Sequence, residues 1–330
     1  MVSRGGSVSV VRAGVGRWDN LPGMPRPSFR AAPVRVRVPA TSANLGPGFD
    51  SVGLALAQYD DVVVRVADEG LYVDVAGEGA DKVPRTARHL VVRALRAGFD
   101  ALGGQPRGLE VVCANRIPHA RGLGSSAAAI VAGLVAARAL VLGGEDDLDD
   151  VRLLALAADI EGHPDNVAAC MLGGLTVAWA DDAGQVRAVR LEPVSALRPV
   201  IFVPSATAST TRARKLLPEA VAHADAARNA GRAALLVHAL STPGVDPGLL
   251  LAATEDRLHQ QYRAPAMPRS VALMNTLRSA GVPAVVSGAG PTVLAFAQGD
   301  TDLSGYVPRG WTSDQVGLDR AGAAVLPLAG

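Results

Sequence analysis

The segment PHARGLGSSAAA, residues 118–129, constrains this chain most, because its glycines lead straight into a long apolar run. Glycine lets a backbone approach phosphate oxygens, and a helix that starts at such a loop adds unpaired N–H groups and a favourable dipole. Ser125 and Ser126 add hydroxyl groups, although Ser125 could instead cap the helix. The segment therefore predicts either a phosphate-binding loop or a plain capped helix over residues 125–142.

Two common phosphate-binding motifs are absent from this segment. The Walker-type loop needs a lysine, and the only lysines of the chain are Lys82 and Lys215. The dinucleotide fingerprint needs a third glycine at the position where Ala127 stands. Any phosphate site at this loop must therefore be of another type.

The composition describes a globular chain with balanced charges. Of its 330 residues 49% are apolar, and a net charge of +1 without runs of like charge argues against nucleic acid or a membrane as the main partner. Cys113 and Cys170 form no CxxC motif, which disfavours structural zinc and fits a reducing compartment. The apolar run 127–137 is shorter than the roughly 20 residues of a membrane span. These features predict a cytoplasmic protein.

The hydrophobic pattern predicts two domains that follow an unstructured extension. Residues 1–32, rich in Gly, Pro, Ser and Arg, predict a disordered N-terminal extension, unless translation starts at Met24. The domains are expected at 33–192 and 193–330. Strands are predicted at 34–38, 61–66, 71–75, 109–113, 175–180, 186–191, 200–204, 283–287 and 292–297, and helices at 89–99, 125–142, 148–160, 212–222, 225–240, 247–261 and 268–280. Strands mixed with helices in both halves indicate an α+β fold.

Two further glycine-rich segments follow predicted strands. VPATSANLGPGFD, residues 38–50, places Asn44 and Asp50 at a strand exit, which suits recognition of a small polar molecule or an Asx-type turn. VVSGAGPT, residues 285–292, lies between two predicted strands, where glycines allow close approach of phosphates or of another backbone. Neither segment decides a function alone.

Taken together, in this order and at these distances, the three segments resemble the motifs of the GHMP kinases, named for galactokinase, homoserine kinase, mevalonate kinase and phosphomevalonate kinase. Residues 118–127 are similar to the family's phosphate loop, and residues 287–292 to its C-terminal motif. The resemblance covers residues 34–297 and implies a two-domain GHMP kinase fold. Its N-terminal domain would be like the second domain of ribosomal protein S5, and its C-terminal domain would be ferredoxin-like. ATP and its substrate are then expected between the two domains.

Within this superfamily the chain resembles the homoserine kinases. The matching segments are ATSANLGPGFD at 40–50, EGHPDNV at 161–167, STTRAR at 209–214 and the pair Tyr262-Arg263. The resemblance implies ATP-dependent phosphorylation of the side-chain hydroxyl of L-homoserine to O-phospho-L-homoserine in threonine biosynthesis, and it leaves a homodimer open. Two alternatives remain: a kinase of another small alcohol such as mevalonate, and a nucleotide-binding sensor without catalysis.

The resemblance also implies an ATP and Mg²⁺ site. Glu161 and Ser126, or Ser125 in its place, are the expected Mg²⁺ ligands. His89 departs from the family, many members of which carry asparagine here, so the role of that asparagine does not transfer directly. The residues implied in ATP binding are His89, Pro118, His119, Ala120, Arg121, Gly122, Leu123, Gly124, Ser125, Ser126, Ala127, Ala128 and Gly288.

Homoserine carries a carboxylate and an ammonium, and the resemblance implies a partner for each. Arg214 and Arg263 are expected to bind the carboxylate, since a guanidinium can do so bidentately. Asp50, with Asn44, suits the ammonium or the backbone beside it. Thr210 belongs to the matched segment that also carries Arg214, and it is a further expected substrate-binding residue.

The reacting hydroxyl is expected near the segment EGHPDNV. The resemblance places His163, Asp165 and Asn166 around it. Asp165 either removes the hydroxyl proton or pairs with the ammonium, and both roles stay open. The expected catalytic residues are Asp165, Glu161 and Arg214.

Overall fold

The computed structural model describes residues 27–207, 210–244, 247–297, 299 and 301–328. Residues 1–26 of the predicted extension lie outside the described residues. The rest of the extension is ordered, contrary to the prediction, because Phe29 forms a β-bridge with Val141 and meets the ring of Phe99 edge-on, 5.5 Å between centroids. This aromatic contact fixes the chain before residue 33.

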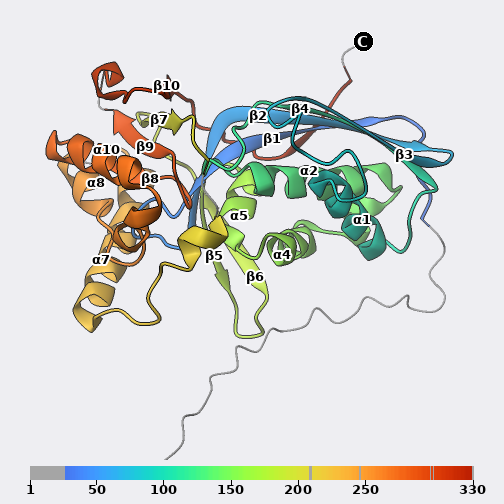
Figure 1. Cartoon of the computed structure of the whole chain (residues 1–330). Coiled ribbons are helices and arrows are strands. Elements are labelled where there is room, and N and C mark those ends of the chain that lie inside the picture. The colour runs from blue at the N-terminus through green and yellow to red at the C-terminus, as the bar shows by residue number, and fades with distance from the viewer. Residues whose placement is uncertain (1–26, 208–209, 245–246, 298, 300, 329–330) are drawn as a thin grey trace, which may run out of the picture.

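A seven-stranded sheet forms the first domain (Figure 1). The strands are β1 (Val34–Ala43), β2 (Val52–Ala67), β3 (Gly70–Gly77), β4 (Gly108–Asn115), β5 (Leu175–Ala180), β6 (Val186–Leu191) and β11 (Ala324–Leu326). Their main order is β11-β1-β2-β4-β3, and β5 joins β2 to β6. The first residues of β2 pair with β5 and its last residues with β4, so one long strand holds the sheet together.

Helices cover one face of this sheet (Figure 1). They are α1 (Leu90–Ala101), α2 (Ser125–Leu140), α3 (Gly144–Asp147), α4 (Asp150–Glu161) and α5 (Pro164–Leu172). Helix α2 packs against β1, α1 and α4, which explains its small apolar residues. It approaches α1 so closely that a Cβ atom on Gly133 would lie 2.6 Å from the Cβ atom of Ala94. From the sheet, Val34, Val36 and Val38 face the same core, as their period of two predicts.

The second domain is built on a four-stranded antiparallel sheet of order β10-β7-β9-β8 (Figure 1). Its strands are β7 (Arg198–Pro204), β8 (Ala284–Val286), β9 (Val293–Ala297) and β10 (Trp311–Gln315). Its helices are α6 (Thr210–Arg214), α7 (His223–Ser241), α8 (Pro247–Ala253), α9 (Gln260–Arg263) and α10 (Pro268–Ser279), with 3₁₀ turns at Ala264–Ala266 and Ser304–Tyr306. Both domains therefore mix helices with mainly antiparallel strands, as the α+β prediction states.

The two domains meet in a common apolar core, and the second domain has a further core of its own around Phe202 and Leu277. Leu240, Val285 and Leu294 of the second half belong to the same buried cluster as the helices of the first domain. The end of the chain also returns to the first domain, because β11 pairs with β1 and places Val325 opposite Val36. Residues near 325, expected in the second domain, are thus part of the first sheet.

Two predicted helices are shorter than their sequence pattern indicates. The helix predicted at 212–222 ends at Arg214, in keeping with Pro218, which disfavours helical backbone at the residue before it. The helix predicted at 247–261 ends at Ala253, where the Thr254 hydroxyl donates to the Leu250 carbonyl and the chain then turns. Helices α3 and α5 and strands β10 and β11 were not predicted from the sequence.

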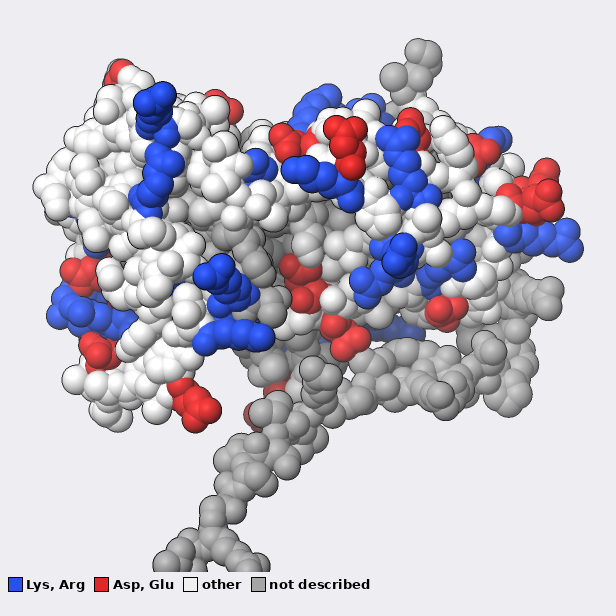
Figure 2. All heavy atoms as spheres, in the orientation of Figure 1, with Lys and Arg blue, Asp and Glu red and all other residues white. Residues whose placement is uncertain are grey.

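The surface agrees with the composition. Basic and acidic side chains are interspersed over the face shown in Figure 2, in keeping with the net charge of +1. Among the described residues, no helix has both the length and the apolar character that crossing a membrane requires.

Candidate active site

A cavity of about 570 Å³ is lined by residues of both domains. The first domain contributes the loop after β1, the loop before α2 and the connection from α4 to α5. The second domain contributes α6, α9 and the turn that follows β8. The predicted site residues in its wall are Asn44, Asp50, His89, His119, Ala120, Gly122, Gly124, Ser125, Ser126, Ala128, Glu161, His163, Asp165, Asn166, Arg214, Arg263 and Gly288. The fold therefore brings the separate sequence motifs to one place.

A few predicted residues are placed elsewhere. Pro118, Arg121, Leu123 and Ala127 stand outside the cavity wall, and Leu123 and Ala127 are buried in the core. Thr210 begins α6, but its side chain lies outside the described part of the structure. The two glycines and the two serines of the predicted phosphate loop thus line the cavity, together with His119, Ala120 and Ala128.

The glycines of the loop have a structural role besides backbone access. Gly122 and Gly124 adopt left-handed backbone, with φ of 78° and 71°. A Cβ atom would lie 2.2 Å from the Ser287 carbonyl oxygen at Gly122 and 1.9 Å from the Thr41 hydroxyl oxygen at Gly124. Gly124, rather than Ser125, is the residue before α2, and no side chain caps this helix. The first N–H groups of α2 therefore lie at the cavity, and no capping side chain accepts a hydrogen bond from them.

The second domain holds this loop in place. The Ser287 hydroxyl donates to the Gly122 carbonyl at 2.6 Å, and the Thr292 N–H donates to the Arg121 carbonyl at 3.2 Å. The Arg121 guanidinium donates to the carbonyls of Pro204 and Ser205 at 2.8 and 2.9 Å. The side chain of Arg121 therefore ties the domains together, and its charge is directed to backbone carbonyls.

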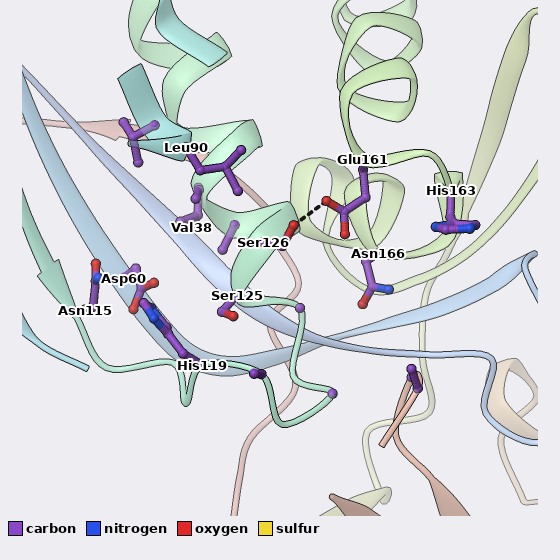
Figure 3. A pocket seen from close by; sticks show the side chains of 18 of the residues that line it. Val38, Asp60, Leu90, Asn115, His119, Ser125, Ser126, Glu161, His163 and Asn166 are labelled. Carbon is purple, nitrogen blue, oxygen red and sulfur yellow. Dashed lines mark hydrogen bonds between the residues drawn. The ribbon is translucent and has the colours of Figure 1, made fainter. Parts of the chain in front are cut away.

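Glu161 and Ser126 lie side by side in the cavity wall (Figure 3). Ser126 is in the first turn of α2, Glu161 ends α4, and the Ser126 hydroxyl donates to the Glu161 carboxylate. Burial raises the pKa of Glu161, although the hydrogen bond from Ser126 opposes this shift. A carboxylate and a hydroxyl beside an uncapped helix start make up the hard-oxygen donors that Mg²⁺ uses together with phosphates. The residues present thus fit the ion that the sequence predicts.

Asp165 and Asn166 form the first turn of α5 and face the same region. Asp165 is 3% exposed, and burial together with the nearby charges of Asp50 and Glu161 raises its pKa to about 6. Its carboxylate accepts the Asn166 N–H at 2.8 Å, and the Asn166 side-chain oxygen accepts the Thr41 hydroxyl at 2.7 Å. A carboxylate with this pKa is a candidate general base near neutral pH.

The opposite wall of the cavity carries the charges expected for an amino acid. The Arg214 guanidinium pairs with the Asp50 carboxylate at 2.7 Å, and the Asp50 N–H donates to the Asn44 side-chain oxygen at 2.9 Å. Arg214 and Arg263 both lie against the ring of Phe49, 5.6 and 5.1 Å from its centroid. In this arrangement the predicted carboxylate and ammonium partners are adjacent and neutralise each other.

His163 follows Glu161 by two residues and also lines the cavity (Figure 3). Burial and the nearby Arg214 lower its pKa, while Asp50 opposes that shift. The imidazole is therefore neutral at pH 7, where it can orient a hydroxyl without adding charge.

The far end of the cavity contains residues that the sequence analysis missed. Asp60 is 5% exposed and accepts the N–H groups of Arg116 and Ile117, and burial raises its pKa to about 6. Asn115 stands beside it in the wall (Figure 3). His89, which the resemblance already implied in ATP binding, lies at the same end and is buried with an unpartnered Nδ1 atom. The acidic pair Asp60-Asp61 inside an otherwise apolar strand is the signal that could have marked this end.

Comparison with known proteins identifies the family. Models of the GHMP kinase N-terminal and C-terminal domains match residues 89–174 and 245–304. The homoserine kinase of Streptomyces coelicolor is 64% identical over 93% of this chain and 98% of its own length. The chain belongs to the homoserine kinases of the GHMP kinase family.

Further members of the family support this assignment. The homoserine kinase of Streptomyces avermitilis is 63% identical over 93% of this chain and 100% of its own length. The crystal structure of homoserine kinase from Cytophaga hutchinsonii has a TM-score of 0.78 at 27% identity and covers 92% of this chain and 100% of its own. The GHMP kinase fold with two α+β domains is thus found in this chain.

Proposed function

We propose that the cavity binds ATP and L-homoserine together and transfers the γ-phosphoryl group to the side-chain hydroxyl, which yields ADP and O-phospho-L-homoserine for threonine biosynthesis. A bond forms between the hydroxyl oxygen and the γ-phosphorus, and the bond from that phosphorus to the β,γ-bridging oxygen breaks. The observation that carries the proposal is one cavity with a phosphate loop at one side and an Asp50–Arg214 pair at the other. Phosphoryl transfer depends mainly on such positioning and charge neutralisation.

The phosphate groups are held by backbone. The N–H groups of residues 122–126 and the start of α2 bind the β- and γ-phosphates, as helix N-termini commonly do. Glu161 and Ser126 would hold Mg²⁺, with Ser125 as the alternative hydroxyl. When bound, the ion neutralises phosphate charge and fixes the orientation of the phosphates. His89, with its free Nδ1 atom, and Asn115 then lie where the base of the nucleotide binds.

The amino acid is held by side chains. Arg214 and Arg263 bind its carboxylate, and Asp50, placed by Asn44, binds its ammonium. Both substrate charges thereby find a partner, whereas mevalonate has no ammonium and would leave Asp50 with less compensation. This difference favours homoserine over the alternative of another small alcohol.

The hydroxyl proton has two candidate fates that concern Asp165. As a general base, Asp165 takes the proton while the new O–P bond forms, which contributes about 10²–10⁴-fold to the rate in enzymes of many kinds. As a charge partner it compensates the ammonium, and the proton leaves to solvent. A fall of kcat as pH decreases through about 6, lost in Asp165→Asn, would support the base role.

A coupled ADP-release assay tests the proposal. Homoserine, threonine, serine and mevalonate are offered with and without Mg²⁺, and the product is identified by ³¹P NMR. ADP release that needs both homoserine and Mg²⁺ is the expected result. Release with mevalonate alone would contradict the substrate assignment, and ATP binding without any turnover would favour the sensor.

We also propose that the enzyme acts in the cytoplasm, as the cysteine usage predicts.

The homodimer remains a prediction. Light scattering of the purified chain measures its mass directly. A mass of about twice the 33.7 kDa of one chain is expected for the dimer.

A further inference from the structure

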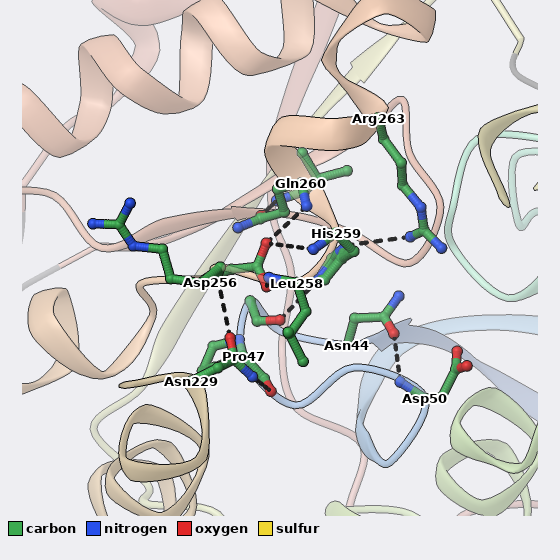
Figure 4. A network of polar contacts seen from close by, with 12 residues as sticks. Asn44, Pro47, Asp50, Asn229, Asp256, Leu258, His259, Gln260 and Arg263 are labelled. Carbon is green, nitrogen blue, oxygen red and sulfur yellow. Dashed lines mark hydrogen bonds and ion pairs between the residues drawn. The ribbon is translucent and has the colours of Figure 1, made fainter. Parts of the chain in front are cut away.

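His259 lies directly behind the cavity wall, at the junction of the two domains. It is 1% exposed and immediately precedes α9, the short helix that carries Arg263 into the wall. The roles described above do not use it. Its two ring nitrogens nevertheless contact two of the segments that line the cavity (Figure 4).

The hydrogen bonds of His259 define its tautomer. Its Nε2 atom lies 2.8 Å from the Gly46 carbonyl oxygen, which can only accept, so Nε2 carries the hydrogen. Its Nδ1 atom lies 3.3 Å from Nη1 of Arg263, which can only donate, so Nδ1 accepts. The ring is therefore neutral, and burial and Arg263 lower its pKa, against Asp256 and Asp50, whose charges raise it. A second proton, on Nδ1, would place an N–H donor of His259 against the N–H donor of Arg263.

The first contact of His259 holds a loop of unfavourable backbone conformation. Asn44, Leu45, Gly46 and Asp50 have φ of 67°, 49°, 83° and 56°. Left-handed backbone is unfavourable for residues other than glycine and persists only where the surrounding structure fixes it. Besides His259, the loop is held by the Asn229 amide, which donates to the Pro47 carbonyl at 2.8 Å. The position of Asp50 therefore depends on contacts with the second domain.

The second contact of His259 orients Arg263. The guanidinium is buried and its Nε atom has no hydrogen-bond partner, so the ring nitrogen of His259 is one of the few acceptors that fix it. The His259 ring also stacks on Phe49, with 5.0 Å between centroids and 22° between planes. Phe49 in turn supports Arg263 and Arg214. One imidazole thus contacts both the loop of Asp50 and the arginine that faces it.

We propose that His259 is a positioning residue that sets the carboxylate-binding and ammonium-binding groups of the cavity at a fixed separation. Its Nδ1 atom orients Arg263 toward the substrate carboxylate, and its Nε2–H group holds the loop that presents Asp50 to the ammonium. This role rests on the substrate placement proposed above. A histidine that only stabilised the core would be equally buried, but its substitution would not change the binding of the substrate carboxylate or ammonium specifically.

Two substitutions separate the two contacts. In His259→Gln the amide nitrogen replaces Nε2 and keeps the bond to Gly46, while the acceptor for Arg263 is lost. In His259→Asn the amide oxygen replaces Nδ1 and keeps the acceptor, while the donor to Gly46 is lost. His238→Gln, at an exposed position of α7, is the matched control.

The decisive measurement is a double-mutant cycle on kcat/KM for homoserine. His259→Gln should lower it about tenfold through KM, which is the effect of one lost hydrogen bond to a charged group, while KM for ATP changes less than about twofold. In the Arg263→Ala background the same substitution should have no further effect. Losses that multiply in the double variant, or an equal rise of KM for ATP, would overturn the proposal.

A substrate analogue tests the other contact. 3-Amino-1-propanol has the hydroxyl and the ammonium of homoserine but no carboxylate. His259→Asn should lower turnover of this analogue and of homoserine by the same factor, whereas His259→Gln should affect homoserine alone. If His259→Gln fails to fold, as judged by its melting temperature, the His259→Asn comparison decides, and an effect confined to homoserine contradicts the proposal.

Failure of the inference differs from failure of the proposed function. A wild-type chain without homoserine turnover would contradict the function, whatever the variants do. A wild-type chain that phosphorylates homoserine, together with variants whose losses multiply, would contradict only the role of His259.

Discussion

The phosphate end and the amino-acid end of the cavity are built in different ways. At the phosphate end, one continuous segment supplies backbone N–H groups, two glycines and the start of a helix. At the amino-acid end, Asp50, Arg214 and Arg263 come from three segments in two domains and are arranged around the ring of Phe49. In the proposed function, phosphate recognition is thus a property of local backbone, whereas homoserine recognition depends on how the domains pack.

This difference determines what substitutions can do at each end. Backbone donors cannot be removed by changing a side chain, so the phosphate end is sensitive mainly at Glu161 and at the glycines. Side-chain donors can be removed one at a time, so the amino-acid end should lose affinity in steps. Substitutions at the two ends therefore test that contrast.

Glu161→Ala should give the largest effect, a fall in kcat of about 10³-fold, because the carboxylate that holds Mg²⁺ at the phosphates is lost. Calorimetry should show that Mg²⁺ no longer strengthens ATP binding to this variant. Glu145→Ala, at an exposed position of α3, serves as the control. Normal turnover at low Mg²⁺ would remove Glu161 from the metal site.

Asp165→Asn should lower kcat about 10²-fold if Asp165 is the general base. In the wild type, kcat should fall as the pH decreases through about 6, because the carboxylate then takes up a proton and can no longer accept one. The variant should lack this dependence, and Asp159→Asn on the exposed side of α4 should retain it. A variant that keeps both its rate and the pH profile would leave Asp165 the role of charge partner.

Arg214→Ala should raise KM for homoserine about 10–100-fold, since it loses a charged hydrogen bond to the carboxylate and leaves Asp50 unpaired. KM for ATP should stay within about twofold. Lys215→Ala, which removes an exposed positive charge from the next residue, is the matched control. If ATP affinity changes and homoserine affinity does not, the two ends of the cavity are assigned the wrong way round.

Asp60→Asn should have the smallest effect, a rise of a few degrees in melting temperature at pH 8. The raised pKa of Asp60 means that its contribution to stability is complete below about pH 4 and is lost as the pH rises through about 6. The asparagine oxygen still accepts from Arg116 and Ile117 but carries no buried charge. The difference between the two proteins should vanish at pH 4, and a difference that is the same at both pH values would contradict the shift.

The phosphate end was predictable from the sequence because it is contiguous. Residues 118–126 show their glycines, serines and following helix in one segment, and both glycines and both serines line the cavity. The reason for the glycines was only partly predictable. Because Gly122 and Gly124 have no side chain, Ser287 and Thr41 can also pack closely against them, and both of these residues are distant in the sequence.

The amino-acid end was predictable only through resemblance. Nothing in local spacing shows that Arg214 would meet Asp50, because their contact depends on the packing of α6 against the loop after β1. His259 and Asp60 were missed for the same reason, since a buried polar residue is recognised by partners distant in the chain. Helix α5 was not predicted, although Pro164 stands at its first position, where proline is favoured because its missing N–H would lack an intrahelical partner in any case.

The most direct test is a crystal structure with homoserine, Mg²⁺ and a non-hydrolysable ATP analogue. We expect the γ-phosphate on the N–H groups of residues 122–126 and the homoserine carboxylate between Arg214 and Arg263. The side-chain hydroxyl should face the γ-phosphorus in line with the bridging oxygen. A homoserine molecule whose carboxylate lies away from both arginines would contradict the account.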